Sequence, residues 1–227
     1  EAFNTAGLGR LAVVLPPIIS PYKNDGSYNT NGSAIGSSNI GVLSTISYFN
    51  PVVSLDLNRS NSENNHIQSS AYIQFKPIKS ITLKSQYGID YLFVSNDLFW
   101  SPVAGDGYSY NGYASAWQTN YKRWLWTNTA SFDQKFGDHS VNVLVGNEQQ
   151  RNTTLGFGIN RQTLSDPAYN LIQAGWTTNN STGQAYGENY LLSSFGRVNY
   201  NYKGKYFLSG NVRQDEYYGL GVKKGTF

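Results

Sequence analysis

Alternation of apolar and polar residues is the clearest feature of the chain, and it is strongest between residues 71 and 91. Ala71, Ile73 and Phe75 share one parity, whereas the positions between them are polar or amphipathic, which is typical of a half-buried strand. A second arm, residues 81–91, repeats this pattern. The short polar corner between the arms, residues 77–80, therefore predicts an antiparallel hairpin.

Two further hairpins are predicted downstream. Residues 123–136 and 140–150 flank a turn at residues 137–139, and residues 189–202 and 206–214 flank a turn at residues 203–205. The third hairpin has the weaker pattern, because Leu191 and Phe195 fall on its polar parity. The chain is thus expected to be all-β, with about six strands arranged as three antiparallel hairpins.

The connections distinguish between two ways of covering the apolar faces. A soluble sandwich would pack them against a second sheet, whereas a membrane barrel would turn them toward lipid. The predicted turns within hairpins are short, but the links between hairpins, residues 96–122 and 151–188, are long. Outer-membrane barrels combine tight periplasmic turns with long extracellular loops. The sequence therefore favours part of a large transmembrane β-barrel.

The aromatic residues and the polar parity fit the barrel interpretation. Tyrosine and tryptophan collect at membrane–water boundaries, and the expected aromatic girdle consists of Tyr91, Trp124, Trp126, Phe132, Tyr200, Tyr202 and Tyr206. The residues expected to face a polar lumen are Gln74, Lys84, Gln86, Asp90, Arg197, Asn199 and Arg213. Aromatic-rich strands also occur in soluble β proteins, so these positions support the barrel without deciding it.

Residues 1–65 are rich in Pro, Gly, Ser and Asn and lack periodicity, which predicts a loop-rich extracellular segment. The first long strand is expected to begin near His66, so residues 66–227 would form the partial barrel. The chain lacks methionine and an amino-terminal leader pattern, so we expect an internal or processed piece. The longest apolar run is too short for a membrane helix and contains two prolines.

Composition excludes several classes of function. The chain has 227 residues, 18 Tyr, 5 Trp and no Cys, which rules out disulfides, thiolate catalysis and cysteine-ligated zinc. A formal net charge of +3 with dispersed basic residues argues against nucleic-acid binding.

Several motifs together resemble the SusC/RagA-type TonB-dependent outer-membrane transporters. These are "NPVVSLDLNRSNSENNHIQSSAYIQFKPIKSITLKSQYGIDY", "VNVLVGNEQQ", "FGRVNYNYKGKYFLSGNVRQD" and "PPIISPYKNDGSY", which cover most of the chain in the expected order. The resemblance implies an internal barrel segment that takes up glycans or oligopeptides in the outer membrane of a Gram-negative, Bacteroidota-type bacterium. It also implies a SusD-like surface lipoprotein as partner, and TonB acting through a plug that is absent from this sequence.

Catalysis is not expected. His66 and His139, the two histidines, are interpreted as solvated residues near polar loops or turns, away from a serine nucleophile. Asp215 and Glu216 follow Arg213, so an ordinary ion pair explains them. Neither a metal site nor a cofactor is predicted, and the chain is expected not to be an enzyme.

Binding is expected to involve aromatic residues in the long connection between the first two hairpins. Tyrosine and tryptophan among Gly, Ser and Asn form adaptable recognition surfaces for sugars and peptides. The candidate substrate-binding residues are Trp100, Tyr108, Tyr110, Tyr113, Trp117 and Tyr121. Alternatively, these rings pack against neighbouring loops or a lid protein. The alternative function for the chain is a soluble all-β carbohydrate-binding module of the cell envelope.

Overall fold

The computed structural model describes residues 7–36, 48–166, 168–219 and 225–226. Within them, most residues belong to β-strands and two short helices precede the first long strand. The helices are α1 (Leu8–Val14) and α2 (Pro51–Leu57). The long strands are β3 (Arg59–Ile78), β4 (Ile81–Trp100), β5 (Tyr113–Phe136), β6 (His139–Leu164), β7 (Trp176–Tyr202) and β8 (Tyr206–Gly219). The minor elements are β1 (Thr30–Asn31), β2 (Ala34–Ile35), η1 (Gly105–Gly107) and β9 (Gly225–Thr226).

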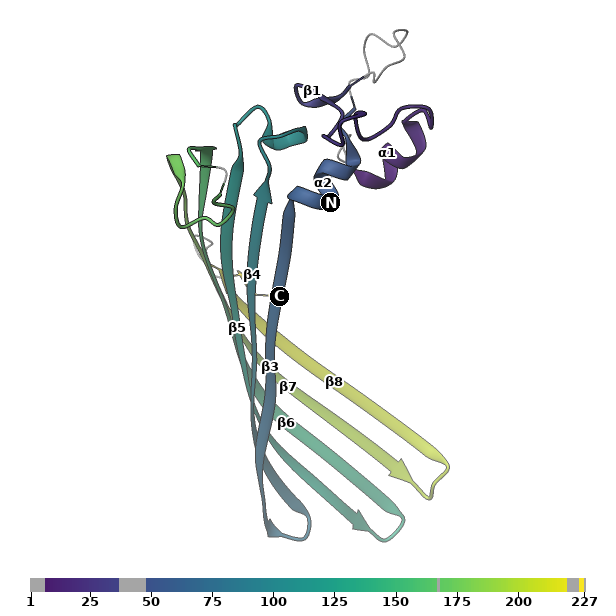
Figure 1. Cartoon of the computed structure of the whole chain (residues 1–227). Helices are drawn as coiled ribbons and strands as arrows, with labels where there is room; N and C mark the ends of the chain where they lie inside the picture. Colours follow the sequence, from purple (N-terminus) through teal and green to yellow (C-terminus); the bar gives the residue numbers. More distant parts are fainter. Residues whose placement is uncertain (1–6, 37–47, 167, 220–224, 227) are drawn as a thin grey trace. The chain divides into compact units, whose positions relative to one another are not determined.

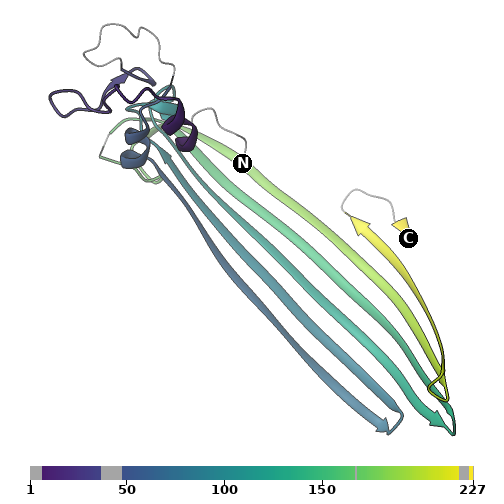
Figure 2. The ribbon, with the colours of Figure 1, turned by 90° about the vertical axis from the view of Figure 1, so that its right-hand side faces the viewer.

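The long strands and β9 form a single sheet in the order β3-β4-β5-β6-β7-β8-β9, so each strand pairs with its neighbour in the sequence. Figures 1 and 2 show β3 to β8 side by side in this order, with tight turns joining β3 to β4, β5 to β6 and β7 to β8. In the last hairpin, antiparallel pairing runs from Tyr202 opposite Tyr206 to Asn189 opposite Gly219. The predicted consecutive antiparallel hairpins are confirmed, and the sheet is open, with β3 and β9 at its edges.

The strands are longer than the sequence predicted. β3 begins at Arg59 instead of near His66, and β4 to β7 extend into the segments that were expected to be long loops. About 10 residues suffice for a tilted strand to cross a bilayer, whereas β4 has 20 and β7 has 27. The extensions are rich in Ser, Asn, Gly and Tyr, because a strand outside an apolar environment keeps its backbone hydrogen bonds without needing an apolar face.

Contacts between Cα atoms divide the chain into two compact units. Unit 1 contains residues 1–63, 95–118 and 157–184, and unit 2 contains residues 64–94, 119–156 and 185–227. Strands β3 to β7 each contribute residues to both units.

The described residues of unit 1 include an apolar core, part of which lies in the segment that the sequence predicted to be loop-rich. Leu11 of α1, Val53 of α2 and Phe99 of β4 are buried, as is Leu164 at the end of β6. These side chains come from segments far apart in the sequence. Their burial removes apolar surface from water, which stabilises the packing of these distant segments.

Two buried asparagines fix the backbone that connects these core residues. The side chain of Asn50 caps α2 by accepting a hydrogen bond from Val52 N at 3.1 Å, and its amide group donates to Pro21 O at 2.7 Å. The amide group of Asn29 donates to Ser20 O at 2.8 Å and to Gly36 O at 2.9 Å. The amide of Asn29 therefore satisfies two carbonyl groups of irregular backbone, and Asn50 adds a second donor to Pro21 O, which also accepts from Asn29 N at 2.8 Å.

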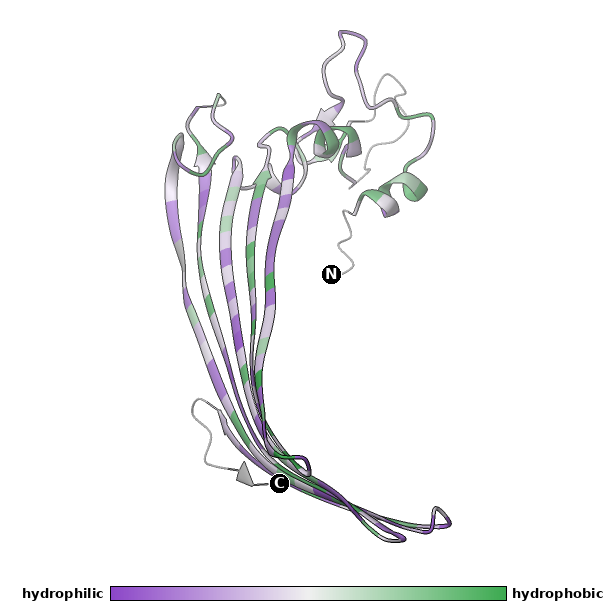
Figure 3. Ribbon diagram, turned by 90° about the horizontal axis from the view of Figure 1, so that it is seen from below, coloured by the Kyte–Doolittle hydropathy of each residue, from purple (hydrophilic) through white to green (hydrophobic). Residues whose placement is uncertain are grey.

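Unit 2 is built differently, because none of its described apolar side chains is buried. Ile73 is 78% exposed, Leu208 and Val212 are each 72% exposed, and Val198 is 48% exposed. Figure 3 shows hydrophobic and hydrophilic residues alternating along the strands. The sheet thus carries an apolar face that no second layer of the described residues covers. Among the helices that the structure describes, none has the length and apolar character needed to cross a membrane.

Candidate functional site

The predicted binding aromatics separate into different environments. Trp100, at the end of β4, lies with its ring centroid 4.9 Å from that of Tyr113, and Tyr110 lies 5.7 Å from Tyr113. The ring of Tyr108 lies beside Gly32, and a Cβ atom added to this glycine would be 3.7 Å from the ring. The structure therefore brings together Trp100, Tyr110 and Tyr113, which we call the Tyr113 cluster.

The Tyr113 cluster is packed but still accessible. Tyr110 is 43% exposed and Tyr108 is 48% exposed, whereas Trp100 and Tyr113 are half-buried. The backbone beside the cluster is fixed, because Tyr110 O accepts a hydrogen bond from Thr163 N at 3.0 Å. One edge of the cluster thus packs internally, as the alternative interpretation expected, while the outer tyrosine rings remain available for contact.

Trp117 and Tyr121, the other two predicted binding residues, lie further along β5 than Tyr113. Trp117 is half-buried on β5 within unit 1. Tyr121 belongs to unit 2, is 45% exposed and lines a hollow beside His66, Asp90 and Arg123. Five of the six predicted aromatics therefore belong to unit 1, and Tyr121 belongs to unit 2.

His66, Asp90 and Arg123 form a charged group on the polar parity of unit 2. His66 Nε2 lies 2.7 Å from Asp90 Oδ1, and Arg123 Nη2 donates a hydrogen bond to Asp90 Oδ2 at 2.8 Å. His66 was expected after a polar loop, near the start of the first long strand, but it lies well within β3 because that strand begins at Arg59. The polar hollow below this group is lined by Gln68, Gln86 and Thr127 together with Asp90 and Arg123.

A second charged group surrounds Arg213 of β8. Arg213 Nε lies 2.8 Å from Asp215, and its Nη2 lies 3.1 Å from Glu148 and 2.9 Å from Ser193 Oγ. The expected pair of Arg213 with Asp215 is present, and Glu148 of β6, on the far side of β7, is a further partner that the sequence did not reveal.

The polar parity also explains the two apolar residues that disturbed the predicted alternation in β7. The register places Phe195 opposite Arg213, whose guanidinium carbon lies 5.8 Å from the ring centroid. The ring also covers Gly146, where a Cβ atom would collide with it. Leu191 shares this parity, since it pairs with Tyr217 four positions along the same ladder. Phe195 therefore packs among charged residues instead of interrupting the strand.

Other predicted lumen residues make contacts on this face. Asn199 donates to Asn142 Oδ1 at 3.0 Å, and Asn142 in turn donates to Asp133. Lys84 Nζ lies 4.6 Å from the ring centroid of Tyr72. Gln74 and Arg197 are exposed.

Aromatic residues on the opposite parity form two rows. We call the first the Trp124 row. The ring centroid of Trp124 lies 6.1 Å from that of Tyr87 and 6.2 Å from that of Tyr190. The ring centroid of Tyr190 lies 6.2 Å from that of Tyr218. Tyr190 is also anchored by its hydroxyl, which donates to Gln149 Oε1 at 2.8 Å. The Trp124 row spans four strands of unit 2.

The second row, the Tyr202 row, lies beside the tight turns. His139 Nδ1 is 2.6 Å from Tyr200 Oη, and its ring is 4.9 Å from Tyr202, which stacks on Tyr206 at 6.3 Å. His139, expected as a solvated turn residue, is thus part of an aromatic row. Trp126 lies next to Trp124 on β5 and donates from Nε1 to Ser85 Oγ at 3.0 Å. Tyr91 and Phe132, also predicted for the girdle, are half-buried and belong to neither row.

The separation of the two rows matches a bilayer. Tyr190 and Tyr200 share a parity on β7 and are ten residues apart. At about 3.3 Å per residue and a tilt of about 40°, this corresponds to roughly 25 Å along the barrel axis, the usual height of the apolar band.

Two ionisable groups of unit 1 lie in its amino-terminal loops, outside these strands. Burial raises the pKa of Tyr28, and its hydrogen bond to Asp56 at 3.1 Å raises it further. The pKa of Asp25 is lowered because its carboxylate accepts hydrogen bonds from the hydroxyl and the backbone N–H of Ser27. Among the residues that the structure describes, no group of three or more His, Cys, Asp or Glu side chains is placed to hold a metal ion.

Comparison with known proteins gives two related results. The chain is 29% identical over 223 residues to TonB-dependent receptor P26 of Formosa agariphila and 23% identical over 201 residues to TonB-dependent receptor P3 of the same organism. These alignments cover 92% and 88% of the chain but only 21% and 19% of the relatives. The resemblance to TonB-dependent receptors is confirmed. The chain spans about a fifth of the length of these receptors.

Solved structures agree on the fold. A chain in the structure of the RagAB peptide transporter matches 91% of this chain with a TM-score of 0.70 and 20% identity, and 23% of that chain is covered. The closed-closed state of the RagAB peptide importer matches with a TM-score of 0.63. No family model matches the chain. The chain therefore has the fold of part of the β-barrel in the RagAB transporter, and the proteins named above to which it is similar are receptors and transporters.

Sequence reasoning missed several residues in these sites. Trp176 packs edge-on against Phe99 at 6.1 Å, and Arg59 pairs with Asp97 at 2.6 Å while donating to Asn170 O at 2.8 Å. These contacts join segments separated by more than thirty positions, which alternation along single strands cannot reveal. The parity of Asp90 in the sequence indicated its polar surroundings. The register between β3 and β4, which brings His66 beside Asp90, left no signal in the sequence.

Proposed function

We propose that the chain is part of an outer-membrane importer that takes up glycans or oligopeptides. In this proposal, a SusD-like surface lipoprotein cooperates with the segments that carry the Tyr113 cluster. TonB acts through a plug that lies outside this chain, and the complete protein resides in the outer membrane of a Bacteroidota-type bacterium.

The observation that carries this proposal is the uncovered apolar parity of unit 2. Ile73, Leu83 and Val198 are 78%, 41% and 48% exposed, although burying such side chains is strongly favourable in water. The opposite parity carries the charged groups around Asp90 and Arg213. An apolar outside and a polar inside are the arrangement of a membrane barrel, and they disfavour the alternative of a soluble carbohydrate-binding module.

The polar parity supports the proposed role as the wall of a passage. Several of its charges lie in groups of opposite sign, with Arg123 on Asp90 and Arg213 on Glu148 and Asp215. Paired charges keep the wall hydrated without creating a strong field of one sign. Such a wall suits neutral or weakly charged cargo, to which both oligosaccharides and mixed-sequence peptides belong.

The membrane arrangement can be tested on the full-length protein by attaching a fluorophore at neighbouring positions of one strand. This chain contains no cysteine, so Ile73→Cys and Gln74→Cys introduce single reactive sites within it. A bimane label at position 73 is expected to be quenched by lipids that carry a nitroxide on the acyl chain, and a label at position 74 by aqueous iodide. Equal iodide quenching at both positions would contradict the membrane barrel.

The cargo can be tested separately by uptake. Cells that lack the gene are complemented with the wild type or with the double variant Tyr108→Ala/Tyr110→Ala, and growth is measured on defined oligosaccharides and on defined peptides. We expect the wild type to restore growth on one of these cargo classes and the variant to require a higher concentration of it. Phe157→Ala, at a residue that is 61% exposed in unit 1, provides a control for the loss of an exposed ring. Restoration of neither class by the wild type would exclude both substrates.

The proposed lipoprotein partner can be tested by purification from the native host. A surface lipoprotein is expected to copurify with the wild-type importer. Its absence after gentle solubilisation and chemical cross-linking would contradict the partnership while leaving the membrane arrangement intact.

A further inference from the structure

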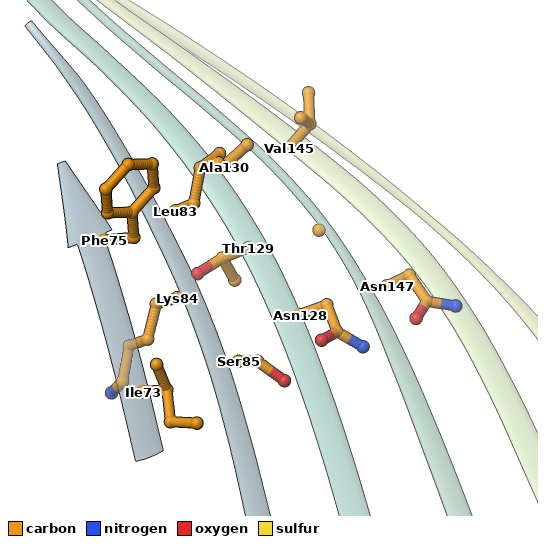
Figure 4. A pocket seen from close by; sticks show the side chains of 11 residues that line it. Ile73, Phe75, Leu83, Lys84, Ser85, Asn128, Thr129, Ala130, Val145 and Asn147 are labelled. Carbon is orange, nitrogen blue, oxygen red and sulfur yellow. The ribbon is translucent and has the colours of Figure 1, made fainter. Parts of the chain in front are cut away.

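The apolar parity of unit 2 is not uniformly filled, because a hollow of about 550 Å³ lies on it. This volume falls within the roughly 300–1,000 Å³ of small-molecule pockets. Figure 4 shows side chains from neighbouring strands around the hollow, with Phe75, Leu83 and Ala130 on one side and Ser85, Asn128 and Asn147 on the other.

Residue size explains the hollow. Ser85 of β4 and Ala130 of β5 have short side chains, whereas the apolar residues around them are longer. Ile73, Phe75 and Val145 stand at its edge and are 78%, 61% and 53% exposed. Short residues between long ones leave a depression whose sides are mostly hydrocarbon, which complements a flexible apolar chain.

The polar end of the hollow is unusual for this parity. Asn128 and Asn147 are half-buried, and neither carboxamide makes a hydrogen bond to the residues that the structure describes. Ser85 already accepts the indole N–H of Trp126. An amide without a partner is costly in hydrocarbon, where no water can satisfy it. These two side chains therefore require a polar group from outside the described chain.

Depth limits what this group can be. Asn128 follows Trp124 by four residues and Trp126 by two, so at about 3.3 Å per residue and a tilt of about 40° it lies roughly 10 Å deeper than the first ring and roughly 5 Å deeper than the second. Tryptophan rings settle at the level of lipid headgroups. The ester, amide and hydroxyl groups that join acyl chains to a headgroup lie just beneath that level, whereas the headgroups themselves do not reach it.

We propose that this hollow binds one acyl chain of a membrane lipid, with Asn128 and Asn147 hydrogen-bonded to the polar linkage at the start of that chain. The inference rests on the proposed membrane barrel and goes beyond it, since a barrel does not require a specific lipid site. The linkage is an ester or a hydroxylated amide, and both offer acceptor atoms that match the two carboxamide donors.

The test uses the full-length importer purified in a mild detergent. Native mass spectrometry and lipid extraction measure how much lipid remains bound after washing. The double variant Asn128→Leu/Asn147→Leu is expected to retain about tenfold less of this lipid than the wild type, because two hydrogen bonds are lost. Ala130→Trp is expected to give a similar loss by filling the hollow. Gln214→Leu makes the same type of change on β8, outside the hollow, and is expected to retain lipid like the wild type.

Reloading identifies the linkage. Delipidated protein is incubated with a diacyl phosphatidylethanolamine as the ester probe or with an N-acylated, 3-hydroxylated lipid as the amide probe. Tighter retention of either probe by the wild type than by the double variant supports the proposal and names the linkage. Equal retention by both proteins overturns it.

A second copy of the importer is the competing occupant of the hollow. If the double variant changes the mass of the assembly from dimer to monomer while its lipid content stays unchanged, the face is a protein interface and the lipid proposal is wrong. The quenching experiment at Ile73→Cys separates these outcomes from a failure of the membrane arrangement itself. Normal quenching together with an absence of bound lipid overturns only the lipid proposal.

Discussion

The two units use apolar residues in opposite ways. Unit 1 buries Leu11, Val53, Phe99 and Leu164 in a core, as proteins in water do. Unit 2 buries polar Thr119 and Ser193 but none of its described apolar side chains, and Ile73 is 78% exposed. The rule that apolar side chains are buried holds for unit 1 but not for unit 2. The medium around a strand decides whether its apolar face or its polar face is stable on the outside.

The same contrast holds for polar groups. In unit 1, the amides of Asn29 and Asn50 hold irregular backbone from within the fold. In unit 2, polar side chains gather on one parity and neutralise one another, as Arg213 does with Glu148 and Asp215. The comparison predicts that equivalent substitutions have different consequences in the two units.

The largest effect is expected from a charge on the apolar parity. Ile73→Arg places a guanidinium in the apolar band and should lower the stability of the membrane-embedded full-length protein by about 2–4 kcal/mol. Gln74→Arg, one residue along β3, reverses the parity and should cost less than about 1 kcal/mol. Urea unfolding in lipid vesicles, followed by tryptophan fluorescence, measures both. Equal costs at the two positions would show that the parities face the same medium.

A smaller loss is expected from the asparagine that organises unit 1. Asn50→Ala removes the cap of α2 and one of the two hydrogen bonds that Pro21 O accepts, so unit 1 should lose about 2 kcal/mol. Hydrogen exchange of residues 48–58, read by mass spectrometry, should accelerate while the exchange of β8 stays unchanged. Asn24→Ala, at an exposed turn residue, is the control and should leave both rates unaltered.

Arg213 is expected to matter less than Asn50, because its side chain is 45% exposed. Arg213→Leu removes three contacts, to Asp215, Glu148 and Ser193, and water can replace part of each. We expect a loss of about 1 kcal/mol, and Arg213→Lys should recover only part of it, because lysine cannot bind two carboxylates in the same fork geometry. Thermal unfolding in detergent compares the three proteins. Full recovery by lysine would show that charge alone matters at this position.

The sequence predicted unit 2 better than unit 1 for a physical reason. A strand between two different media shows its environment as alternation, so the hairpins around residues 79–80, 137–138 and 203–205 were predicted correctly. The buried apolar residues of unit 1, Leu11, Val53, Phe99 and Leu164, come from segments far apart in the sequence, so their burial leaves no periodic signal in any one segment. The ends of β4 to β7 escaped prediction because their alternation fades where the strands leave the apolar band.

The candidate sites follow the same division. Parity predicted the polar surroundings of Asp90 and Arg213, because neighbours on one face of a strand are set by the backbone alone. It did not predict that Glu148 would meet Arg213, since β6 and β8 are separated by β7 in the sheet and the contact passes over that strand. Nor did it separate Tyr121 from the Tyr113 cluster, because all six predicted rings lie within one stretch of sequence.

The smallest effects are expected from single rings, and here the two units differ in kind more than in size. Tyr113→Leu in unit 1 and Trp124→Leu in unit 2 each remove two ring contacts, worth about 0.5–1.5 kcal/mol beyond the area that they bury. Trp124 belongs to a row placed at the boundary of the apolar band, so its loss should change how stability depends on the thickness of the host bilayer. Tyr113 packs within unit 1, so its loss should lower stability equally in thin and thick bilayers. Unfolding measured in vesicles of short-chain and long-chain lipids distinguishes the two, and an equal thickness dependence in both variants would remove the Trp124 row from the membrane boundary.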